Sequence, residues 1–221
     1  MNLPASLFST SWHVFMTALT AVVFFWIVRT TPWKRVVDGA QLNVLLGFSV
    51  VLMLAWSMKA GVKPGLNLHM LGAMAGTLML GPRRALIALA IALTGITLNG
   101  AVEWQAWPIN FILMAVIPVG IANLLHHLIQ RKLPNHFFVF IFVTSFAGAA
   151  LTVMLQGAVS STAMIAAGAY QAEFLLSDYL PFFLLLGFAE AWISGAMVTL
   201  FVVYRPEWVS GFDDNRYLVN K

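Results

Sequence analysis

The chain has 221 residues, of which 61% are hydrophobic and 9% are charged, and its formal net charge is +4. About a quarter of the residues of a soluble domain are charged, so this composition excludes a soluble protein and requires a lipid environment. The basic residues are dispersed among short segments, which excludes nucleic acid as the reason for the positive charge. The chain contains no cysteine, which excludes disulfides, thiolate metal sites and thiol catalysis.

Seven apolar segments separated by charged residues each predict a membrane-spanning helix, because about 20 apolar residues cross a bilayer. In chain order they are 12–28, 41–58, 66–82, 85–101, 106–129, 137–160 and 180–203. Met1 to Thr10 carries no basic side chain, so it does not resemble a signal peptide and we expect the first helix to be retained. We therefore expect an all-α polytopic bundle in which residues 1–221 form one integral membrane domain.

The sixth apolar segment belongs to a longer stretch, 133–172, that contains no Asp, Glu, Lys or Arg. These 40 residues exceed the length that one helical crossing needs. The second part, 158–171, is rich in small and weakly polar residues. We expect it to form an outer loop or a re-entrant segment.

The distribution of basic residues predicts the orientation in the membrane. When the seven helices alternate in direction, ten of the twelve Lys and Arg fall on one side and only Lys59 and Lys63 on the other. The positive-inside rule then places the C-terminus in the cytoplasm and the N-terminus outside. Glu103, Glu173 and Asp178 lie on the outer side in this arrangement, where they would concentrate cations.

Glu190 is the charged residue that the sequence places near the middle of a predicted span. A carboxyl group inside a membrane is costly, so it indicates either a hydrogen bond that joins two helices or a role in ligand binding. Both interpretations remain open from the sequence. The predicted polar partners are Asn110, Gln156 and Asn99.

His69 begins the third predicted helix, at its outer end. A neutral imidazole there is a suitable ligand for a divalent metal ion, although an isolated histidine is often structural. His13 lies at the outer end of the first predicted helix and could reach the same vestibule. His126 and His127 lie at the cytoplasmic end of the fifth, where they are expected to be interfacial.

Catalytic motifs are missing from the sequence. It contains no phosphate-binding loop of the GxxxxGK[ST] type, no HExxH and no GxSxG. The chain is therefore not expected to hydrolyse ATP itself, and we do not expect an enzyme.

Two segments carry a resemblance to a known family. The run HMLGAMAGTLMLGPRRALIALAIALTG, followed by PINFILMAVIPVG, resembles the CbiM/NikM family, the cobalt and nickel permease components of energy-coupling factor ABC transporters. The residues that match the family pattern are His69, Gly72, Gly81, Pro82, Asn110 and Gly120. The closing run FAEAWISGAMVTLFVVYRPEW is also similar, through Glu190 and residues 205–207, although Ala191 stands where the family has glycine. The resemblance covers about residues 65–208.

This resemblance implies a substrate-binding subunit of an importer for a divalent transition-metal ion, in a bacterial inner membrane. The implied partners are membrane lipid, a transmembrane coupling subunit and cytoplasmic ATPase subunits, with no nucleic acid and no tightly bound cofactor. Docking is expected through small-residue faces such as Gly72 to Gly76. The family site joins the N-terminal amine and a second-position histidine to the third-helix histidine, which is His69 here.

The chain departs from the family at its start, because it begins Met1-Asn2 and lacks that second-position histidine. Of the family's N-terminal ligands, only the amine has a counterpart here, on Met1. His13 is a candidate to replace the missing second-position histidine. The chain is therefore expected to bind cobalt or nickel, a different ion such as zinc or copper, or a non-metal small molecule. The alternative is a membrane protein without transport activity, either a scaffold or an intramembrane metal-dependent enzyme built on His69 and Glu190.

Overall fold

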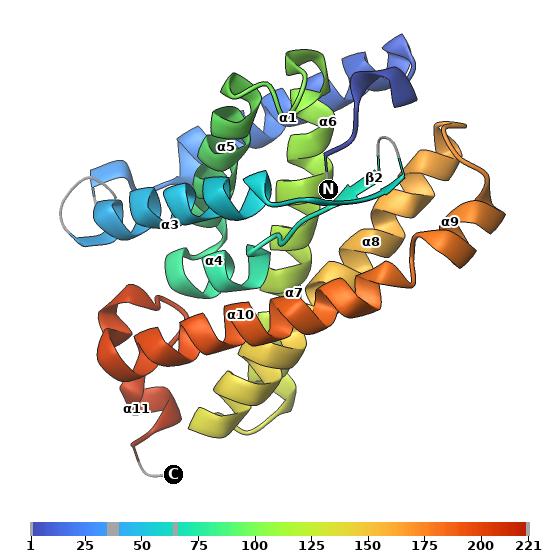
Figure 1. The fold of residues 1–221 in the computed structure, drawn as a ribbon. Helices are drawn as coiled ribbons and strands as arrows, with labels where there is room; N and C mark the ends of the chain where they lie inside the picture. The colour runs from blue at the N-terminus through green and yellow to red at the C-terminus, as the bar shows by residue number, and fades with distance from the viewer. Residues whose placement is uncertain (1, 35–39, 64–65, 220–221) are drawn as a thin grey trace.

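The structure, a computed structural model, describes residues 2–34, 40–63 and 66–219 as a helical bundle with one short hairpin (Figure 1). The regular elements in chain order are η1 (Ala5–Leu7), α1 (Thr10–Thr30), α3 (Ala40–Ser57), β1 (Ala60–Lys63), β2 (Leu66–Leu68), α4 (Ala73–Leu80), α5 (Pro82–Leu98), η2 (Trp104–Ala106), α6 (Trp107–Phe111), the π-helical η3 (Ile112–Val116), α7 (Ile117–Lys132), the π-helical η4 (Val139–Ala147), α8 (Gly148–Ala166), α9 (Ala172–Asp178), α10 (Phe182–Tyr204), η5 (Pro206–Trp208) and α11 (Asp214–Tyr217).

Four helical segments of the described chain are long and apolar enough to cross a membrane. They are Thr10–Thr30, Trp104–Lys132, Val139–Ala166 and Phe182–Tyr204. Helices α3 and α5, with 18 and 17 residues, lie at the short end of the range for a crossing, about 17 to 25 residues. The prediction of an all-helical membrane protein is confirmed.

The third predicted helix, 66–82, is wrong over its first part. Leu66–Leu68 form strand β2, which pairs with β1 in an antiparallel hairpin that places Ala60 opposite Leu68. Gly72 then adopts a φ of 68°, a left-handed conformation that does not continue a helix, and α4 begins only at Ala73. Helix α4 has 8 residues and is about 12 Å long, too short to cross a bilayer.

The prediction of an outer loop or re-entrant segment at 158–171 is also wrong for most of its length. Helix α8 continues without interruption to Ala166. Ser160, Ser161 and Met164 on its last turns are buried against the bundle. Small and weakly polar residues are well tolerated at helix contacts in lipid, which is why this composition did not end the helix. The chain turns at Gly168, where φ is 71°.

Apolar side chains divide into a core and an outer surface. Aromatic residues such as Trp56 and Phe111 are fully buried between the helices. Helices α1 and α10 also leave large apolar side chains exposed on their outer faces, among them Phe25, Leu185 and Phe188. Exposed apolar faces along membrane-spanning helices are the surfaces that contact lipid.

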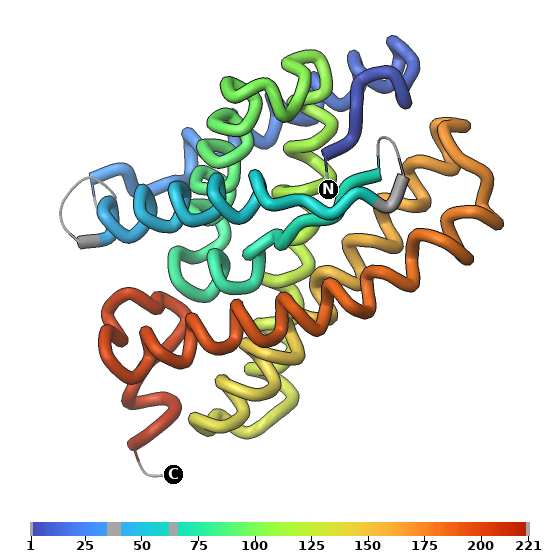
Figure 2. Tube along the Cα trace, viewed as in Figure 1, coloured from blue at the N-terminus to red at the C-terminus, as the bar shows by residue number. Residues whose placement is uncertain are grey.

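The small face of α4 is used inside the chain. Helix α3 lies directly against α4 in the trace (Figure 2), and all eight residues of α4 are buried. A Cβ atom at Gly76 would lie 2.8 Å from Cε1 of Phe48, and one at Gly72 would lie 2.6 Å from Cδ2 of Leu52. The prediction that this face docks a partner subunit is therefore wrong, because α3 already fills it.

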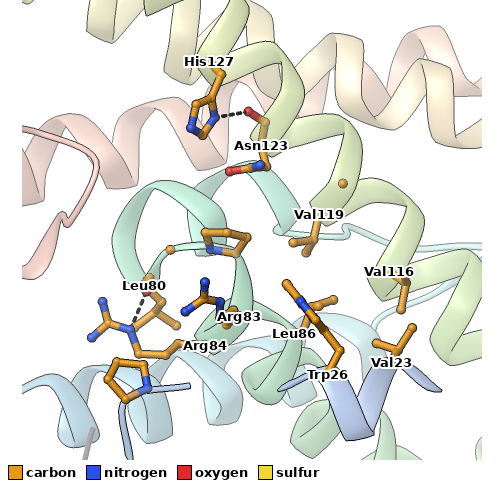
Figure 3. Close-up of a pocket in the computed structure, with 14 residues that line it drawn as sticks. Val23, Trp26, Leu80, Arg83, Arg84, Leu86, Val116, Val119, Asn123 and His127 are labelled. Atoms are coloured by element: carbon orange, nitrogen blue, oxygen red, sulfur yellow. Dashed lines mark hydrogen bonds between the residues drawn. The ribbon is translucent and has the colours of Figure 1, made fainter. Parts of the chain in front are cut away.

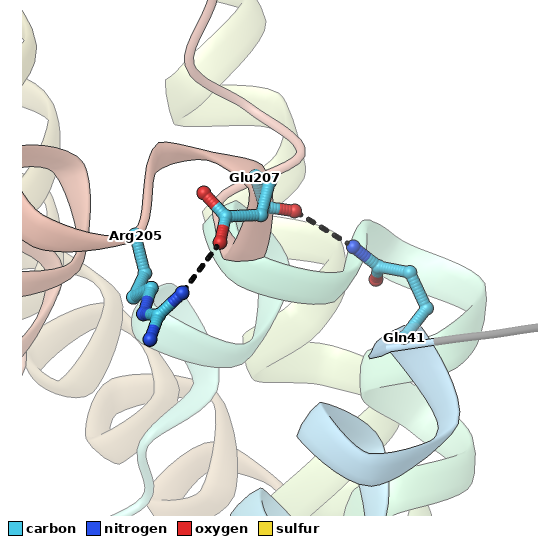
Figure 4. A network of polar contacts seen from close by, with 3 residues as sticks. All are labelled: Gln41, Arg205 and Glu207. Atoms are coloured by element: carbon cyan, nitrogen blue, oxygen red, sulfur yellow. Dashed lines mark hydrogen bonds and ion pairs between the residues drawn. The ribbon is translucent and has the colours of Figure 1, made fainter.

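The segment after α10 is tied back to the bundle by a small polar network (Figure 4). The side chain of Gln41 donates from Nε2 to the carbonyl oxygen of Glu207 at 2.9 Å, and its Oε1 accepts from Arg84 at 2.9 Å. Glu207 also pairs with Arg205 at 3.6 Å, but both side chains are exposed, so this ion pair adds little stability. Gln41 thus connects α3 to α5 and to η5 through hydrogen bonds.

Candidate metal site

The N-terminal segment lies inside the bundle, beside β2 (Figure 1), with Asn2 and Leu3 buried. Asn110 of α6 holds this segment through its backbone. Its Oδ1 accepts from the amide of Leu3 at 2.9 Å, and its Nδ2 donates to the carbonyl oxygen of Leu3 at 2.9 Å. Because Asn110 is completely buried, these bonds form away from water, where an unmade bond is costly.

Two further contacts fix the same segment at Ala5. Oε2 of Glu103 accepts from the amide of Ala5 at 2.8 Å. Nε2 of His13 lies 3.1 Å from the carbonyl oxygen of Ala5, and it donates there because a carbonyl can only accept. Together with Asn110, these contacts place residue 2 at a defined position in the bundle.

That position is against His69, in the loop between β2 and α4. Nε2 of His69 lies 3.1 Å from Oδ1 of Asn2, and Nδ1 lies 3.0 Å from the carbonyl oxygen of Met70. The ring of Trp56 packs against the imidazole with 5.0 Å between centroids. His69 is only 3% exposed, and this burial lowers the pKa of its imidazole well below the ordinary value of 6.5. The ring is therefore neutral at physiological pH, as metal binding requires.

Glu190 of α10 holds the loop that carries His69. Its Oε1 accepts from the backbone amides of Leu71 and Gly72, the latter at 3.0 Å, and its Oε2 accepts from the hydroxyl of Ser194 at 3.0 Å. The two amides belong to the turn that separates β2 from α4, where no regular element supplies an acceptor. Glu190 thus holds the His69 loop at Leu71 and Gly72, whereas Asn2 contacts it at His69.

A cavity of about 280 Å³ lies at the N-terminal segment. Its lining includes Asn2, Asn67 and Glu103. Asn2 both faces this cavity and contacts His69, so the site lies at the cavity's inner wall. The carboxylate of Glu103 gives the opening a negative charge that attracts cations.

The other predicted ligands lie as follows. Met1 is outside the described residues. His13 is bound to Ala5 and anchors the N-terminal segment. No group of three or more His, Cys, Asp or Glu side chains comes together anywhere in the described chain, so a metal site here has to include donors of other kinds.

The predicted amide partners of Glu190 were wrong. Asn110 binds Leu3, as described above. Gln156 donates from Nε2 to the carbonyl oxygen of Leu113 at 3.1 Å and to Ser160 at 2.9 Å, where it satisfies the irregular backbone of the π-helical segment η3. Asn99 is exposed at the end of α5. Backbone amides bind the carboxylate instead, because the short α4 leaves the turn before it unpaired.

Sequence reasoning did not find the contact between Asn2 and His69, or the roles of Trp56 and Ser194. In the sequence, Asn2 is notable only as the position where the family histidine is missing, although its side chain carries an oxygen that can bind a metal ion. Ser194 lies four residues after Glu190 on the same helix, which is a spacing that brings two side chains together. That spacing was the available signal for Ser194, whereas the contact of Trp56 depends on the hairpin.

The fold and the site define a polytopic helical membrane protein that places its own N-terminal segment over a buried, neutral histidine. The profile of the CbiM family, described as the cobalt uptake substrate-specific transmembrane region, matches residues 2–208. The chain belongs to this family and is a multi-pass membrane component of transition-metal uptake, not an enzyme. The alternatives of a scaffold and an intramembrane enzyme are therefore set aside.

Two solved structures share the fold. A crystal structure described as a transition metal transporter superposes with a TM-score of 0.78 at 18% sequence identity, over 90% of this chain and 92% of the other. A truncated transition metal transporter gives the same TM-score and identity, over 92% of this chain and 98% of the other. The comparison with curated proteins gives no match.

Proposed function

We propose that this chain is the substrate-binding subunit of an energy-coupling-factor-type importer, and that it captures a divalent transition-metal ion between His69 and Asn2. The observation that carries the proposal is the 3.1 Å separation between Nε2 of His69 and Oδ1 of Asn2, inside the bundle. Both residues are buried. His69 is held through Nδ1 by the carbonyl oxygen of Met70, and Asn2 is held through the backbone of the next residue, Leu3.

The facing atoms both carry lone pairs. Nδ1 of His69 lies 3.0 Å from the carbonyl oxygen of Met70, so Nδ1 bears the hydrogen and Nε2 of the neutral ring is an acceptor. Oδ1 of Asn2 is also an acceptor, and Nδ2 of the same amide is buried without a hydrogen-bond partner. Two facing acceptors repel each other. A cation bound to both atoms removes this repulsion. Without a cation, rotation of the Asn2 amide by 180° removes it, because Nδ2 then donates to Nε2 of His69.

The separation matches two neighbouring ligands of one metal ion. Bonds of about 2.0 to 2.2 Å at a right angle place two donor atoms roughly 2.8 to 3.1 Å apart. The Nε2 to Oδ1 distance is 3.1 Å. The amine of Met1, one residue from Asn2 in the chain, is proposed as a third donor.

The mixed donor set is less specific for nickel than an all-nitrogen site. An imidazole nitrogen is a stronger-field ligand than an amide oxygen, and a strong ligand field is what stabilises square-planar Ni²⁺. Replacing a second-position imidazole by the amide oxygen of Asn2 therefore reduces the advantage of nickel over cobalt, although Ni²⁺ and Cu²⁺ still bind such sites well. We propose Co²⁺ as the substrate, in agreement with the description of the family, with Ni²⁺, Zn²⁺ and Cu²⁺ as competing ions.

Transport requires energy that this chain does not supply, because its sequence has no phosphate-binding loop. We propose a transmembrane coupling subunit and cytoplasmic ATPases as partners, in a bacterial inner membrane. Release of the ion requires a second conformation that binds it less tightly. The N-terminal segment provides one, since its withdrawal removes Asn2 from His69.

The test is metal binding to purified protein, measured by calorimetry with Co²⁺, Ni²⁺, Zn²⁺ and Cu²⁺ in turn. We expect His69→Ala to abolish measurable binding and Asn2→Ala to weaken Co²⁺ binding about tenfold, through loss of one ligand. Asn2→His should raise the affinity for Ni²⁺ relative to Co²⁺.

His136→Ala is the matched control, because His136 is a partly exposed histidine whose ring contacts Phe138 and none of the residues of the site. It should bind Co²⁺ as the wild type does. Equal Co²⁺ binding by the wild type and His69→Ala would refute the site, and so would the absence of binding for all four ions.

A further inference from the structure

Another cavity of the described chain is lined by none of the residues of the metal site. It has a volume of about 810 Å³ and lies between the end of α1, the start of α5 and the middle of α7 (Figure 3). Helix α1 and helix α7 are both membrane-spanning, so this cavity opens beside lipid. Neither the binding of a metal ion nor the N-terminal segment accounts for it.

One wall of the cavity is basic and polar. Arg83, Arg84, Asn123 and His127 line it, and no Asp or Glu is among the described residues that do so. Arg83 donates to the carbonyl oxygen of Thr30 at 2.6 Å with one of its N–H groups. A guanidinium carries five N–H donors, so several remain for an anion.

Another part of the cavity wall is apolar. Val23, Leu86, Val116 and Val119 converge on the cavity from α1, α5, η3 and α7 (Figure 3). Trp26 lies between the two walls, with the guanidinium carbon of Arg83 at 5.7 Å from its ring centroid. An occupant that matches both walls has an anionic group joined to a hydrocarbon chain.

Gly120 on α7 keeps the cavity open. It lines the cavity, and a Cβ atom added there would meet nothing within 4 Å. Any larger side chain at this position would therefore extend into the cavity without a backbone clash.

The cavity lies at the basic end of its helices, where lipid headgroups are found. Arg29 is in the last turn of α1, and Arg131 and Lys132 are in the last turn of α7. A second cavity of about 250 Å³ shares Asn123 and His127 with the first and extends the polar wall to Arg131. Clusters of basic residues between membrane helices at the interface bind anionic phospholipid headgroups.

We propose that this cavity binds one anionic glycerophospholipid, with its phosphate at Arg83 and Arg84 and an acyl chain along Val23, Val116 and Val119. The polar wall is basic and therefore favours an anionic headgroup. The apolar wall favours an occupant with a hydrocarbon chain, which a lipid has and a free phosphate lacks. The lipid fills the space between α1 and α7 and fixes the end of α1 to the start of α5.

Native mass spectrometry of the delipidated full chain tests the proposal, with titration of phosphatidylglycerol, phosphatidylcholine and glycerol phosphate. We expect one tightly bound phosphatidylglycerol and at least about tenfold weaker binding of phosphatidylcholine and of glycerol phosphate. Gly120→Leu and Arg83→Gln should each weaken phosphatidylglycerol binding about tenfold.

Matched controls exist for both changes. Gly47→Leu places the same side chain at another open helical glycine, on α3, and Arg29→Gln removes a basic residue that does not line the cavity. Both controls should bind phosphatidylglycerol as the wild type does.

Equal binding of the two phospholipids would overturn the proposal, and so would wild-type binding by both Gly120→Leu and Arg83→Gln. Glycerol phosphate binding as tight as that of phosphatidylglycerol would assign the polar wall to a free anion instead. Loss of a co-expressed coupling subunit from both variants, with phosphatidylglycerol binding intact, would assign the cavity to a protein partner.

Discussion

Replacing Glu190 by alanine is expected to damage both the stability of the protein and its metal site. The carboxylate is the acceptor for the amides of Leu71 and Gly72 and for the hydroxyl of Ser194. A buried donor left without its partner costs about 1 to 3 kcal/mol, so the two orphaned amides alone cost roughly 2 to 6 kcal/mol. The His69 loop is also released, and loss of a residue that orients a ligand typically lowers metal affinity about 10- to 100-fold.

Two further variants separate these effects. Glu190→Gln keeps an oxygen that can accept both amides, so it should restore most of the Co²⁺ affinity and lose roughly 1 to 2 kcal/mol through weaker, uncharged hydrogen bonds. Ser194→Ala removes one hydrogen bond and leaves both amides paired, so it should bind Co²⁺ as the wild type does.

Thermal unfolding in detergent and calorimetric Co²⁺ titration provide the two measurements. The reasoning would be refuted if Glu190→Ala unfolded at the wild-type temperature and bound Co²⁺ with wild-type affinity. It would also fail if Glu190→Gln were as impaired in Co²⁺ binding as Glu190→Ala, since the carboxylate would then act through its charge and not by holding the loop.

Two other predictions concern the N-terminal segment and the packing of α4. Asn110→Ala removes both bonds to Leu3 and should lower Co²⁺ affinity at least about tenfold in calorimetry, because Asn2 is no longer held in place; unchanged affinity would contradict this. Gly76→Leu clashes with Phe48 and should lower the free energy of unfolding by about 1 to 3 kcal/mol, seen as a lower unfolding temperature, whereas Gly47→Leu should not. Equal stability of the two variants would contradict the packing of α3 on α4.

The sequence predicted those parts of the fold that are determined by long apolar segments. The predicted segments agree to within a few residues with the continuous spans Thr10–Thr30, Trp104–Lys132 and Phe182–Tyr204 and with α3 and α5, and they locate the start of Val139–Ala166 but not its end. The hairpin and α4 were not, because their residues are apolar enough to resemble a span and the left-handed conformation of Gly72 depends on its contacts with α3. Hydrophobicity indicates that a segment is buried, but it does not distinguish a membrane crossing from a buried turn.

The sequence draws attention to His69 and Glu190, but it does not show the contacts that support them. His69 was identified from its position and from the family pattern, and Glu190 from its burial cost. The sequence does not reveal the connection between them, because Glu190 binds backbone amides. Every residue except proline has such an amide, so no residue type marks the contact. Asn110 was assigned to the wrong partner for the same reason, since its contacts are with the main chain of Leu3.

Because the N-terminal segment is held through its backbone, the placement of the second residue is independent of its chemical identity. Asn110 contacts only main-chain atoms of Leu3, so the same bonds form whatever side chain precedes it. A substitution at Asn2 therefore changes the donor atom that faces His69 without moving the segment. It follows that variants of Asn2 should change the ratio of Co²⁺ to Ni²⁺ affinity, whereas variants of Asn110 should lower both affinities in the same proportion. Paired calorimetric titrations with Co²⁺ and Ni²⁺ distinguish these outcomes. A changed ratio of the two affinities in Asn110→Ala would show that Asn110 also influences which ion is bound.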